Sequence, residues 1–467
     1  MSTSIRSVHI TNYYHKDSGG ISTSYNNLLE AAARRGRYIS LIVPGEKESV
    51  ETVNEFAKIH YVPARFSPFF DKRYRVMMPW QYMLSDTPIR KILLDEMPDM
   101  IEVTDKYTLS SIGHMIRMNQ FKRIGRPMLV HFSCERMDDN VRSFLNAGKP
   151  GKELANRLMV NYQLPGYDFH IANSSYTADE FFETFRTSAN SSRSEWFLNK
   201  CWRLFKAPRI PLDERVFVCP RGVDLERFSS DKASSVGKAA IKNETSIPNE
   251  SIILLYAGRI SPEKNIELLV DLMKLLSHET DRDFRLLVAG SGPQSDWLKR
   301  QSKTVARGKI TLLGHLSKER LAEYYANADI FVHPNPREPF GIAPLEAMSS
   351  GVPVVAPNSG GILSYATDAN AWLTTPDGPS FAAAVNEIIG NRGLRLEKIE
   401  RAQAAARDHS WRDSTDRLLD TYDQIYADFQ RRHALFTDRE AAKEFDYAGM
   451  MKQMEIRSPI DRIGSVI

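Results

Sequence analysis

The chain has 467 residues, more than one ordinary core requires, so we expect two large domains. Its 62 Lys and Arg against 58 Asp and Glu give a net charge of only +4, which argues against wholesale nucleic-acid binding and leaves room only for a local basic patch. Three cysteines, Cys134, Cys201 and Cys219, lack CxxC spacing, which argues against a disulfide framework or a structural zinc site and favours a reducing cytoplasm.

The first residues, MSTSIRSVHITNYYH, contain no apolar signal-peptide core. No later apolar run approaches the roughly 20 residues that span a bilayer. We therefore expect a cytoplasmic protein that is soluble or at most peripheral on the inner face of the membrane.

Short apolar runs, each followed by a turn and a segment of helical periodicity, predict parallel β/α units. In the first half the predicted strands are residues 7–12, 38–45, 127–133 and 168–175. In the second half they are residues 251–259, 284–292, 309–314, 329–335 and 352–357. The two sets predict an α/β protein with two doubly wound domains and a cleft between them, with ligands beyond the carboxyl ends of the strands.

The domain boundary is predicted near residue 235, because the Ser, Lys, Asn and Pro content from Ser229 onward suits a surface linker. We expect a first domain over residues 1–235, linker start included, and a second over 236–408. Residues 409–429 look like a long helix that returns to the first domain. For the tail up to residue 467 we expect partly helical packing against that domain and assign no function.

Gly19 and Gly20 follow the first predicted strand and open a predicted helix that runs to about Arg35. Backbone amides at such a helix start, free of side-chain bulk, face an anion or a sugar. A plain tight turn explains the two glycines equally well.

The segment GRISPEKN follows the strand at 251–259 and places Arg259, Glu263 and Lys264 at the start of a second helix. Cations at a helix N-terminus oppose the helix dipole, which indicates a compensating anion such as a diphosphate. The alternative is a solvated Arg and Lys with Glu263 as a local partner.

The segment REPFGIAPLEAMSSG carries two glutamates, Glu338 and Glu346. A helix that begins near Ile342 directs its free amides and Gly341 to a point that the two carboxylates flank. Carboxylates accept paired hydrogen bonds from vicinal hydroxyls, so the pattern suits a nucleotide sugar, which has hydroxyls on both sides of its phosphates. Either glutamate alone is also explained as a surface acid or a helix-dipole partner.

Together with PRGVDLERF (220–228), GSGP (290–293) and SGG (359–361), these blocks stand in the order typical of one enzyme family. From about Ser7 to Phe429 the chain resembles retaining glycosyltransferase family 4, of GT-B fold, with two Rossmann-like domains that face a central cleft. The segments SGGISTSYNNLLEAAARRG, IEVTDKY (101–107) and SCERMD (133–138) are similar to bacterial members that mannosylate or glucosylate lipid-linked acceptors.

The resemblance implies transfer of a hexose from a UDP-sugar or GDP-mannose to a hydroxyl of a glycan or lipid-linked acceptor. Arg259 and Lys264 would hold the diphosphate, Glu338 the sugar hydroxyls and Glu346 the ribose. His131 matches the family's histidine near the reacting sugar, although a histidine in an apolar strand is also commonly a core residue. The SCER segment and Arg221, where many members carry Asn, depart from the family's pattern.

The same family implies retention of anomeric configuration by front-face substitution, in which the departing phosphate helps to deprotonate the acceptor. Charge on the leaving group can be neutralised by Arg259, Lys264 and the amides after Gly341, so we expect no metal and no other cofactor. The one DxD, Asp281 with Asp283, precedes a strand rather than following one and is read as a surface turn.

Two basic, aromatic stretches, 65–82 and 193–209, could dock an anionic membrane. In the second, Phe197, Cys201 and Phe205 recur at helical spacing, which a packed helix with solvated basic residues also explains.

Two rival functions stay open: a nucleotide-sugar epimerase of the same fold, which needs no acceptor, and a catalytically silent nucleotide-sugar or glycan-binding module.

Overall fold

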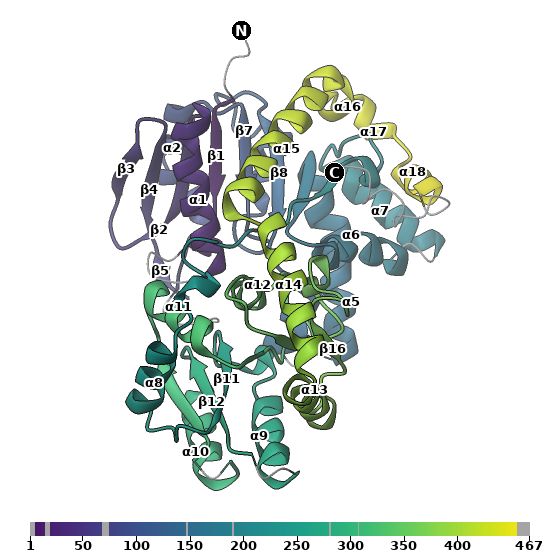
Figure 1. Cartoon of the computed structure of the whole chain (residues 1–467). Helices are drawn as coiled ribbons and strands as arrows, with labels where there is room; N and C mark the ends of the chain where they lie inside the picture. The colour runs from purple at the N-terminus through teal and green to yellow at the C-terminus, as the bar shows by residue number, and fades with distance from the viewer. Residues whose placement is uncertain are drawn as a thin grey trace. The chain divides into compact units, whose positions relative to one another are not determined.

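The computed structural model describes residues 5–14, 19–67, 74–145, 148–188, 191–279, 282–306 and 308–454. The chain divides into two compact units: unit 1 comprises the residues up to Pro220 and those from Thr415 onward, and unit 2 comprises Arg221–Ser414 (Figure 1). The division comes before the predicted boundary near 235. The predicted linker is wrong, because Ser234 caps helix α8 (Ser235–Glu244) and Ile241 on that helix packs into the core of unit 2.

Unit 1 is built around an eight-stranded sheet with the order β10-β9-β8-β7-β1-β2-β4-β3. All neighbours pair in parallel except β3, which is antiparallel to β4. The strands are β1 (Ser7–Ile10), β2 (Ile39–Gly45), β3 (Ser49–Asn54), β4 (Ala57–Pro63), β7 (Met100–Val103), β8 (Met128–Ser133), β9 (Phe169–Ala172) and β10 (Val216–Val218). A separate short ribbon pairs β5 (Arg65–Phe66) with β6 (Arg75–Val76).

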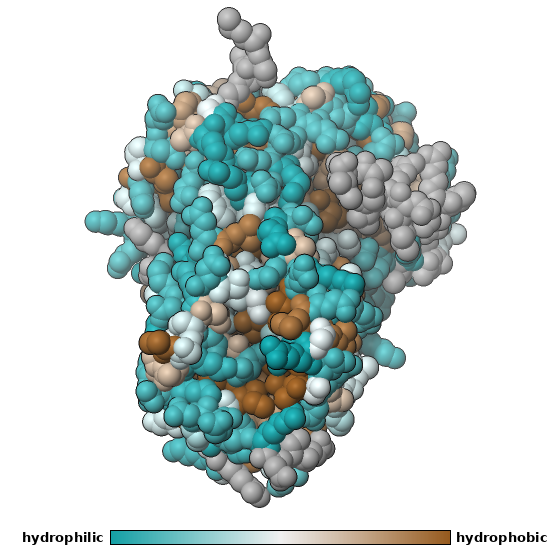
Figure 2. Space-filling view, in the orientation of Figure 1, coloured by the Kyte–Doolittle hydropathy of each residue, from teal (hydrophilic) through white to brown (hydrophobic). Residues whose placement is uncertain are grey.

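The helices of unit 1 come from both ends of the chain. They are α1 (Gly20–Arg35), α2 (Pro88–Glu96), α3 (Ser111–Arg117), α4 (Met137–Leu145), α5 (Gly148–Leu158), α6 (Ser175–Ser188), α7 (Ser192–Leu204), α15 (Trp411–Arg431), α16 (His433–Thr437), α17 (Ala441–Glu444) and α18 (Tyr447–Met454). The apolar side of α15 packs on the sheet through Leu419, Tyr422, Ile425 and Phe429. Figure 2 shows that hydrophilic side chains cover most of the visible face over α1 and α15, as expected for amphipathic helices.

Unit 2 contains a six-stranded parallel sheet with the order β13-β12-β11-β14-β15-β16. Its strands are β11 (Ile252–Ala257), β12 (Phe284–Ala289), β13 (Ile310–Gly314), β14 (Ile330–Val332), β15 (Val354–Pro357) and β16 (Trp372–Thr374). Its helices are α8, α9 (Glu267–Glu279), α10 (Ser295–Thr304), α11 (Lys318–Asn327), α12 (Ile342–Ser349), α13 (Gly378–Gly390) and α14 (Arg392–Asp408). In chain order the strands run 3-2-1-4-5-6, the Rossmann order.

Each of the nine predicted strands corresponds to a strand of the structure, which is one to three residues shorter at one or both ends. The sequence analysis missed β3, β4, β5, β6, β7, β10 and β16. The first of these is largely exposed, and β10 and β16 have only three residues each, too few for a periodic signal.

The tail packs on unit 1 as predicted, as far as the structure describes it. Tyr447 of α18 contacts Trp202 of α7, with 5.3 Å between ring centroids, and donates a hydrogen bond to the Ala207 carbonyl. Within the described ranges no helix has both the length and the apolar character to cross a membrane.

Candidate active site

In unit 2 the winding direction of the sheet reverses between β11 and β14, which are neighbours. The loops that leave the carboxyl ends of these two strands diverge, and this switch point is where ligands bind in doubly wound sheets. The loop after β11 carries Arg259 and Lys264, and the loop after β14 carries Glu338. The structure thus brings the predicted residues of two motifs to one place.

Glu338 is held at this point by groups from both loops. Lys264 Nζ lies 2.7 Å from Glu338 Oε2, and Asn335 Nδ2 donates to the same oxygen at 2.9 Å. His333 Nε2 is 3.7 Å away. Burial alone would raise the pKa of Glu338, but the Lys264 charge and the hydrogen bonds outweigh it and lower the pKa to about 2. Glu338 is therefore an ionised acceptor at neutral pH.

The loop from Glu338 to Gly341 rests on the SGG segment. The Gly361 amide donates to the Glu338 carbonyl at 2.7 Å, and a Cβ on Gly361 would lie 2.0 Å from the Pro339 carbonyl oxygen. Ser359 donates to the Pro336 carbonyl at 2.9 Å. The glycines of this motif therefore serve close backbone packing, which fixes the position of Glu338.

Helix α12 begins at Ile342, as predicted, with Gly341 as its N-cap at φ 88°. The hydroxyl of Tyr365 donates to the Gly341 carbonyl. Glu346 lies one turn into the helix and is partly exposed, beside Tyr325 and Lys318 of α11. Burial raises its pKa to about 7, so its neighbours only partly stabilise its charge, in contrast to those of Glu338.

Arg259 leaves the carboxyl end of β11 and faces Glu263, with 3.8 Å between Nη1 and Oε1. Its carbonyl accepts a hydrogen bond of 2.8 Å from Tyr256. The carboxylate that compensates Lys264 is Glu338, 74 residues away in sequence. The compensating anion that the sequence analysis expected beside Lys264 is thus supplied by the chain itself.

The GSGP glycines pack this edge of the sheet together. A Cβ on Gly290 would lie 1.9 Å from the Gly258 carbonyl oxygen, and one on Gly292 would lie 2.2 Å from that of Ile260. The loops after β11 and β12 therefore touch backbone to backbone.

The sheet of unit 1 has its own switch point, between β1 and β7. Asn12, after β1, donates to Asp105 Oδ2, after β7, at 3.1 Å. The other oxygen of Asp105 accepts the backbone amides of Tyr107 and Leu109 at 2.9 and 2.8 Å. Tyr13 donates to Glu135, after β8, at 2.9 Å. Polar side chains from three neighbouring strands thus meet at this edge.

Helix α1 begins at Gly20 with Gly19 as its N-cap, at φ 98°. A Cβ on Gly19 would meet nothing closer than Ser22 Oγ at 4.0 Å. Gly19 is therefore required for its backbone conformation rather than for space. Residues 15–18 before it lie outside the described residues.

The predicted role of His131 at a reacting sugar is not supported by its position. Its side chain is wholly buried inside β8, with ring centroids 5.5 Å from Tyr167 and 5.9 Å from Phe181. Burial, together with the neighbouring His170, moves its pKa well below the usual range, so the ring is neutral. The strand continues to Ser133, so the residue at the carboxyl edge is Glu135, and His131 is a core residue.

Several site residues escaped the sequence analysis. His333 and Asn335 were predicted as part of a strand, but β14 ends at Val332. The side chains of these two residues lie beside the carboxylate of Glu338. Tyr13 and Asp105 were not singled out. The available signal was their place directly after an apolar strand, the rule that identified Arg259.

Of the DxD, Asp281 lies outside the described residues, and Asp283 pairs with Arg285 at 2.8 Å and Lys309 at 3.3 Å. These two cations occupy the oxygens of Asp283.

Two doubly wound α/β units, with motif residues gathered at the switch point of unit 2, have the GT-B fold. The matching family model and relatives identify the chain as a glycosyltransferase. Residues 237–408 match the family model described as Glycosyl transferases group 1.

The comparisons with whole proteins extend this likeness to most of the chain. The chain is 26% identical over 404 residues to a GDP-mannose-dependent alpha-(1-6)-phosphatidylinositol dimannoside mannosyltransferase from Mycobacterium tuberculosis, covering 86% of this chain and 92% of the relative. Sucrose-phosphate synthase from Thermosynechococcus elongatus superposes with a TM-score of 0.67 at 18% identity, over 90% of this chain and 99% of that one. Anabaena HepE, solved in complex with UDP and glucose, gives 0.62 at 17%, over 90% and 100%.

Proposed function

We propose that the chain transfers a hexose from a nucleoside-diphosphate sugar to a hydroxyl of a glycan or lipid-linked acceptor, with retention of anomeric configuration and without a metal. The observation that carries the proposal is the ionised Glu338, paired with Lys264 at the switch point of unit 2. A carboxylate suits sugar hydroxyls, and a lysine beside it suits the phosphate next to that sugar.

Each part of the donor, namely the diphosphate, the sugar and the ribose, has a candidate partner in unit 2. Arg259, Lys264 and the amides at Gly341 and Ile342 would hold the diphosphate, because cations and helix N-terminal amides both stabilise anionic oxygens. Glu338 would accept hydrogen bonds from the sugar and Glu346 from the ribose. GDP-mannose is the donor we would test first, since the full-length relative from Mycobacterium tuberculosis is named for it.

In this reaction the bond from the anomeric carbon to the phosphate breaks and a bond to the acceptor oxygen forms on the same face. Negative charge grows on the leaving diphosphate, and Lys264 and Arg259 stabilise it. The departing phosphate oxygen accepts the acceptor's proton. No carboxylate nucleophile enters the sequence of steps, and the position of Glu338 in an ion pair is consistent with a binding role.

The deciding experiment measures release of nucleoside diphosphate from a panel of GDP- and UDP-sugars in the presence of a chelator, with and without a lipid and glycan extract. We expect release from one donor, increased by the extract and unaffected by the chelator. Loss of release in chelator that Mg²⁺ or Mn²⁺ restores would contradict metal independence. Binding of a donor without release would favour a silent binding module.

We also propose that unit 1 contacts an anionic membrane through α7. The helix buries Leu198 and Trp202, whereas Trp196 and Phe197 are 61% and 49% exposed, and Lys200 Nζ lies 4.9 Å from the ring centroid of Trp196. Aromatic and basic side chains on one exposed face suit a lipid interface. Flotation with anionic vesicles at low salt should carry the protein upward, and Trp196→Ala with Phe197→Ala should leave it at the bottom.

A further inference from the structure

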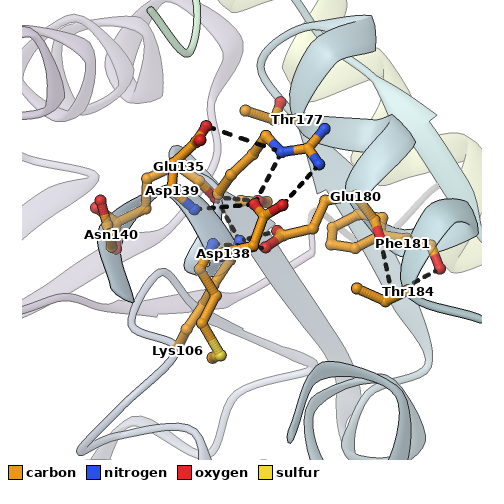
Figure 3. A network of polar contacts seen from close by, with 12 residues as sticks. Lys106, Glu135, Asp138, Asp139, Asn140, Thr177, Glu180, Phe181 and Thr184 are labelled. Carbon is orange, nitrogen blue, oxygen red and sulfur yellow. Dashed lines mark hydrogen bonds and ion pairs between the residues drawn. The ribbon is translucent and has the colours of Figure 1, made fainter. Parts of the chain in front are cut away.

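The segment SCER (133–136), which departs from the family's pattern, runs from the end of β8 to the start of α4. A buried ion pair fixes its position (Figure 3). Lys106 Nζ lies 2.6 Å from Glu180 Oε2, and the two side chains are 1% and 0% exposed. Lys106 also donates to the carbonyl of Glu135. Glu180 accepts the amides of Met137 and Asp138 at the start of α4. The pair therefore determines the path of the loop that carries Glu135.

Arg136, in the same loop, is also held in ion pairs within the chain. Arg136 contacts Asp138 at 3.0 Å through Nε and Glu183 at 2.5 Å through Nη2. Burial alone would lower the pKa of Arg136, but these carboxylates outweigh it and raise it. The positive charges of Lys106 and Arg136 are thus neutralised by carboxylates within the chain.

The carboxylate of Glu135, in contrast, is held by neutral donors. It accepts a hydrogen bond of 2.9 Å from Tyr13 and another from Asn140, and it is partly exposed. Asn140 donates in addition to the hydroxyl of Tyr107 at 2.9 Å. Burial raises the pKa of Glu135, and the hydrogen bonds from Asn140 and Tyr13 together with the charge of Lys106 offset this effect only in part.

We define the polyol cluster as four partly exposed residues: Tyr13, Tyr107, Glu135 and Asn140. They come from the loops after β1 and β7 and from the loop and helix after β8, so they lie at the switch point of unit 1. Two phenol rings, a carboxylate and an amide are the groups that recognise a sugar or cyclitol ring, whose C–H faces pack on aromatic rings and whose hydroxyls need acceptors and donors.

We propose that the polyol cluster binds a neutral, hydroxyl-rich ring of the acceptor, with Glu135 accepting hydrogen bonds from vicinal hydroxyls. The inference rests on the proposed function and specifies its acceptor. A phosphorylated ring fits poorly, because the cluster offers it a carboxylate and the nearby cations Lys106 and Arg136 are buried as well as paired, unlike the partly exposed Lys264. Lys106 and Glu180 act as positioning residues that hold Glu135 in place.

Binding of the ring can be measured without any turnover. Saturation-transfer difference NMR with methyl α-mannopyranoside and myo-inositol as probes, and myo-inositol 1-phosphate as the charged comparison, reports binding directly. We expect at least one neutral probe to bind the full chain more tightly than the phosphate. Glu135→Gln should weaken that binding about tenfold or more, since the amide has one acceptor oxygen in place of two and cannot accept paired hydrogen bonds from vicinal hydroxyls. Tyr13→Phe should weaken it less.

Glu153→Gln is the matched control, because Glu153 pairs with Arg157 on the exposed surface of α5, both side chains being 66% exposed. It should leave probe binding unchanged. Donor binding, followed separately by calorimetry, should be the same in wild type and Glu135→Gln. A failure of the proposed donor site in unit 2 can then be distinguished from a failure of ring binding at the polyol cluster.

Equal binding of the neutral probe to wild type and Glu135→Gln, with both variants folded by circular dichroism, would overturn the proposal. So would tighter binding of the phosphorylated probe than of either neutral one, or binding of none of the three probes to wild type. If Glu135→Gln does not fold, the double variant Tyr13→Phe/Asn140→Ala takes its place in the binding measurement. Unchanged binding of the neutral probe to this double variant would also overturn the proposal.

Discussion

At the residue scale, the two glutamates of the E-x7-E motif have opposite electrostatic environments. Glu338 is stabilised as an anion by Lys264 and Asn335, whereas Glu346 is disfavoured as an anion by burial. The motif therefore provides one permanent charge, on Glu338, and one carboxyl that titrates near neutrality, on Glu346. The two residues call for different experiments.

Glu338→Gln should reduce transfer far more than it weakens nucleoside diphosphate binding. The amide is isosteric but removes the charge opposite Lys264, and we expect the transfer rate to fall about 100-fold or more with less than about tenfold change in the Kd of the diphosphate. Transfer rates and calorimetric titration check this. Equal losses in both would assign Glu338 to general support of the site.

Glu346 predicts a pH dependence of stability. Its folded pKa of about 7 lies above the ordinary value of 4.5, so between these values the folded state binds more protons than the unfolded state. Its stabilising contribution is complete below pH 4.5 and is lost as the pH rises through 7, by about 3 kcal/mol. Denaturant unfolding from pH 4.5 to 8 measures this. Glu346→Gln should flatten that part of the profile, and an unchanged profile would contradict the raised pKa.

At the element scale, the start of α12 depends on one backbone conformation. Gly341 has φ 88°, and a Cβ there would lie 2.9 Å from Tyr365 Oη and 3.3 Å from Glu338 Cγ. An L-residue is strained in this region and would also push against the side chain that the loop presents.

Gly341→Ala should therefore lower both stability and activity. We expect a loss of about 1–3 kcal/mol of unfolding free energy and a larger relative loss of transfer than of folding. The control is Gly393→Ala in α14, where the nearest atom to an added Cβ is Asn391 Oδ1 at 3.8 Å and φ is not positive. That change should be neutral or stabilising. If the two variants behave alike in thermal unfolding and activity assays, the strain argument is wrong.

At the scale of the whole molecule, unit 1 is completed by residues from the far end of the chain. Arg34 on α1 pairs with Asp416 at 2.6 Å, and Arg37 pairs with Asp423 at 2.8 Å, which places α15 beside α1 (Figure 1). Below them Tyr422 donates to Glu102, a buried carboxylate of β7 that also accepts from Tyr25. The core of unit 1 therefore requires the chain to have passed through unit 2 and returned.

Tyr422→Ala should destabilise unit 1 specifically. Removal of a fully buried ring and of a hydrogen bond to a buried carboxylate should cost about 3–5 kcal/mol, and Tyr422→Phe about 1–3 kcal/mol from the unsatisfied carboxylate alone. Hydrogen exchange should show lost protection in β1, β7 and α1, with the strands of unit 2 unchanged. Uniform loss of protection across both units would indicate a single cooperative block instead.

The sequence by itself determined nine of the strand segments, the start of α12 at Ile342 and the place of Arg259 and Glu338 after strand ends, because periodicity, glycine and proline act over a few residues. Its motifs also indicated the GT-B fold. Only the tertiary structure decided the burial, the hydrogen-bond partners and the charge state of each side chain. Lys264 and Glu338 meet across 74 residues and Tyr13 and Glu135 across 122, while His131 turns out to be buried. Burial and hydrogen-bond partners are set by segments distant in sequence, so charge state and access to substrate follow from the fold.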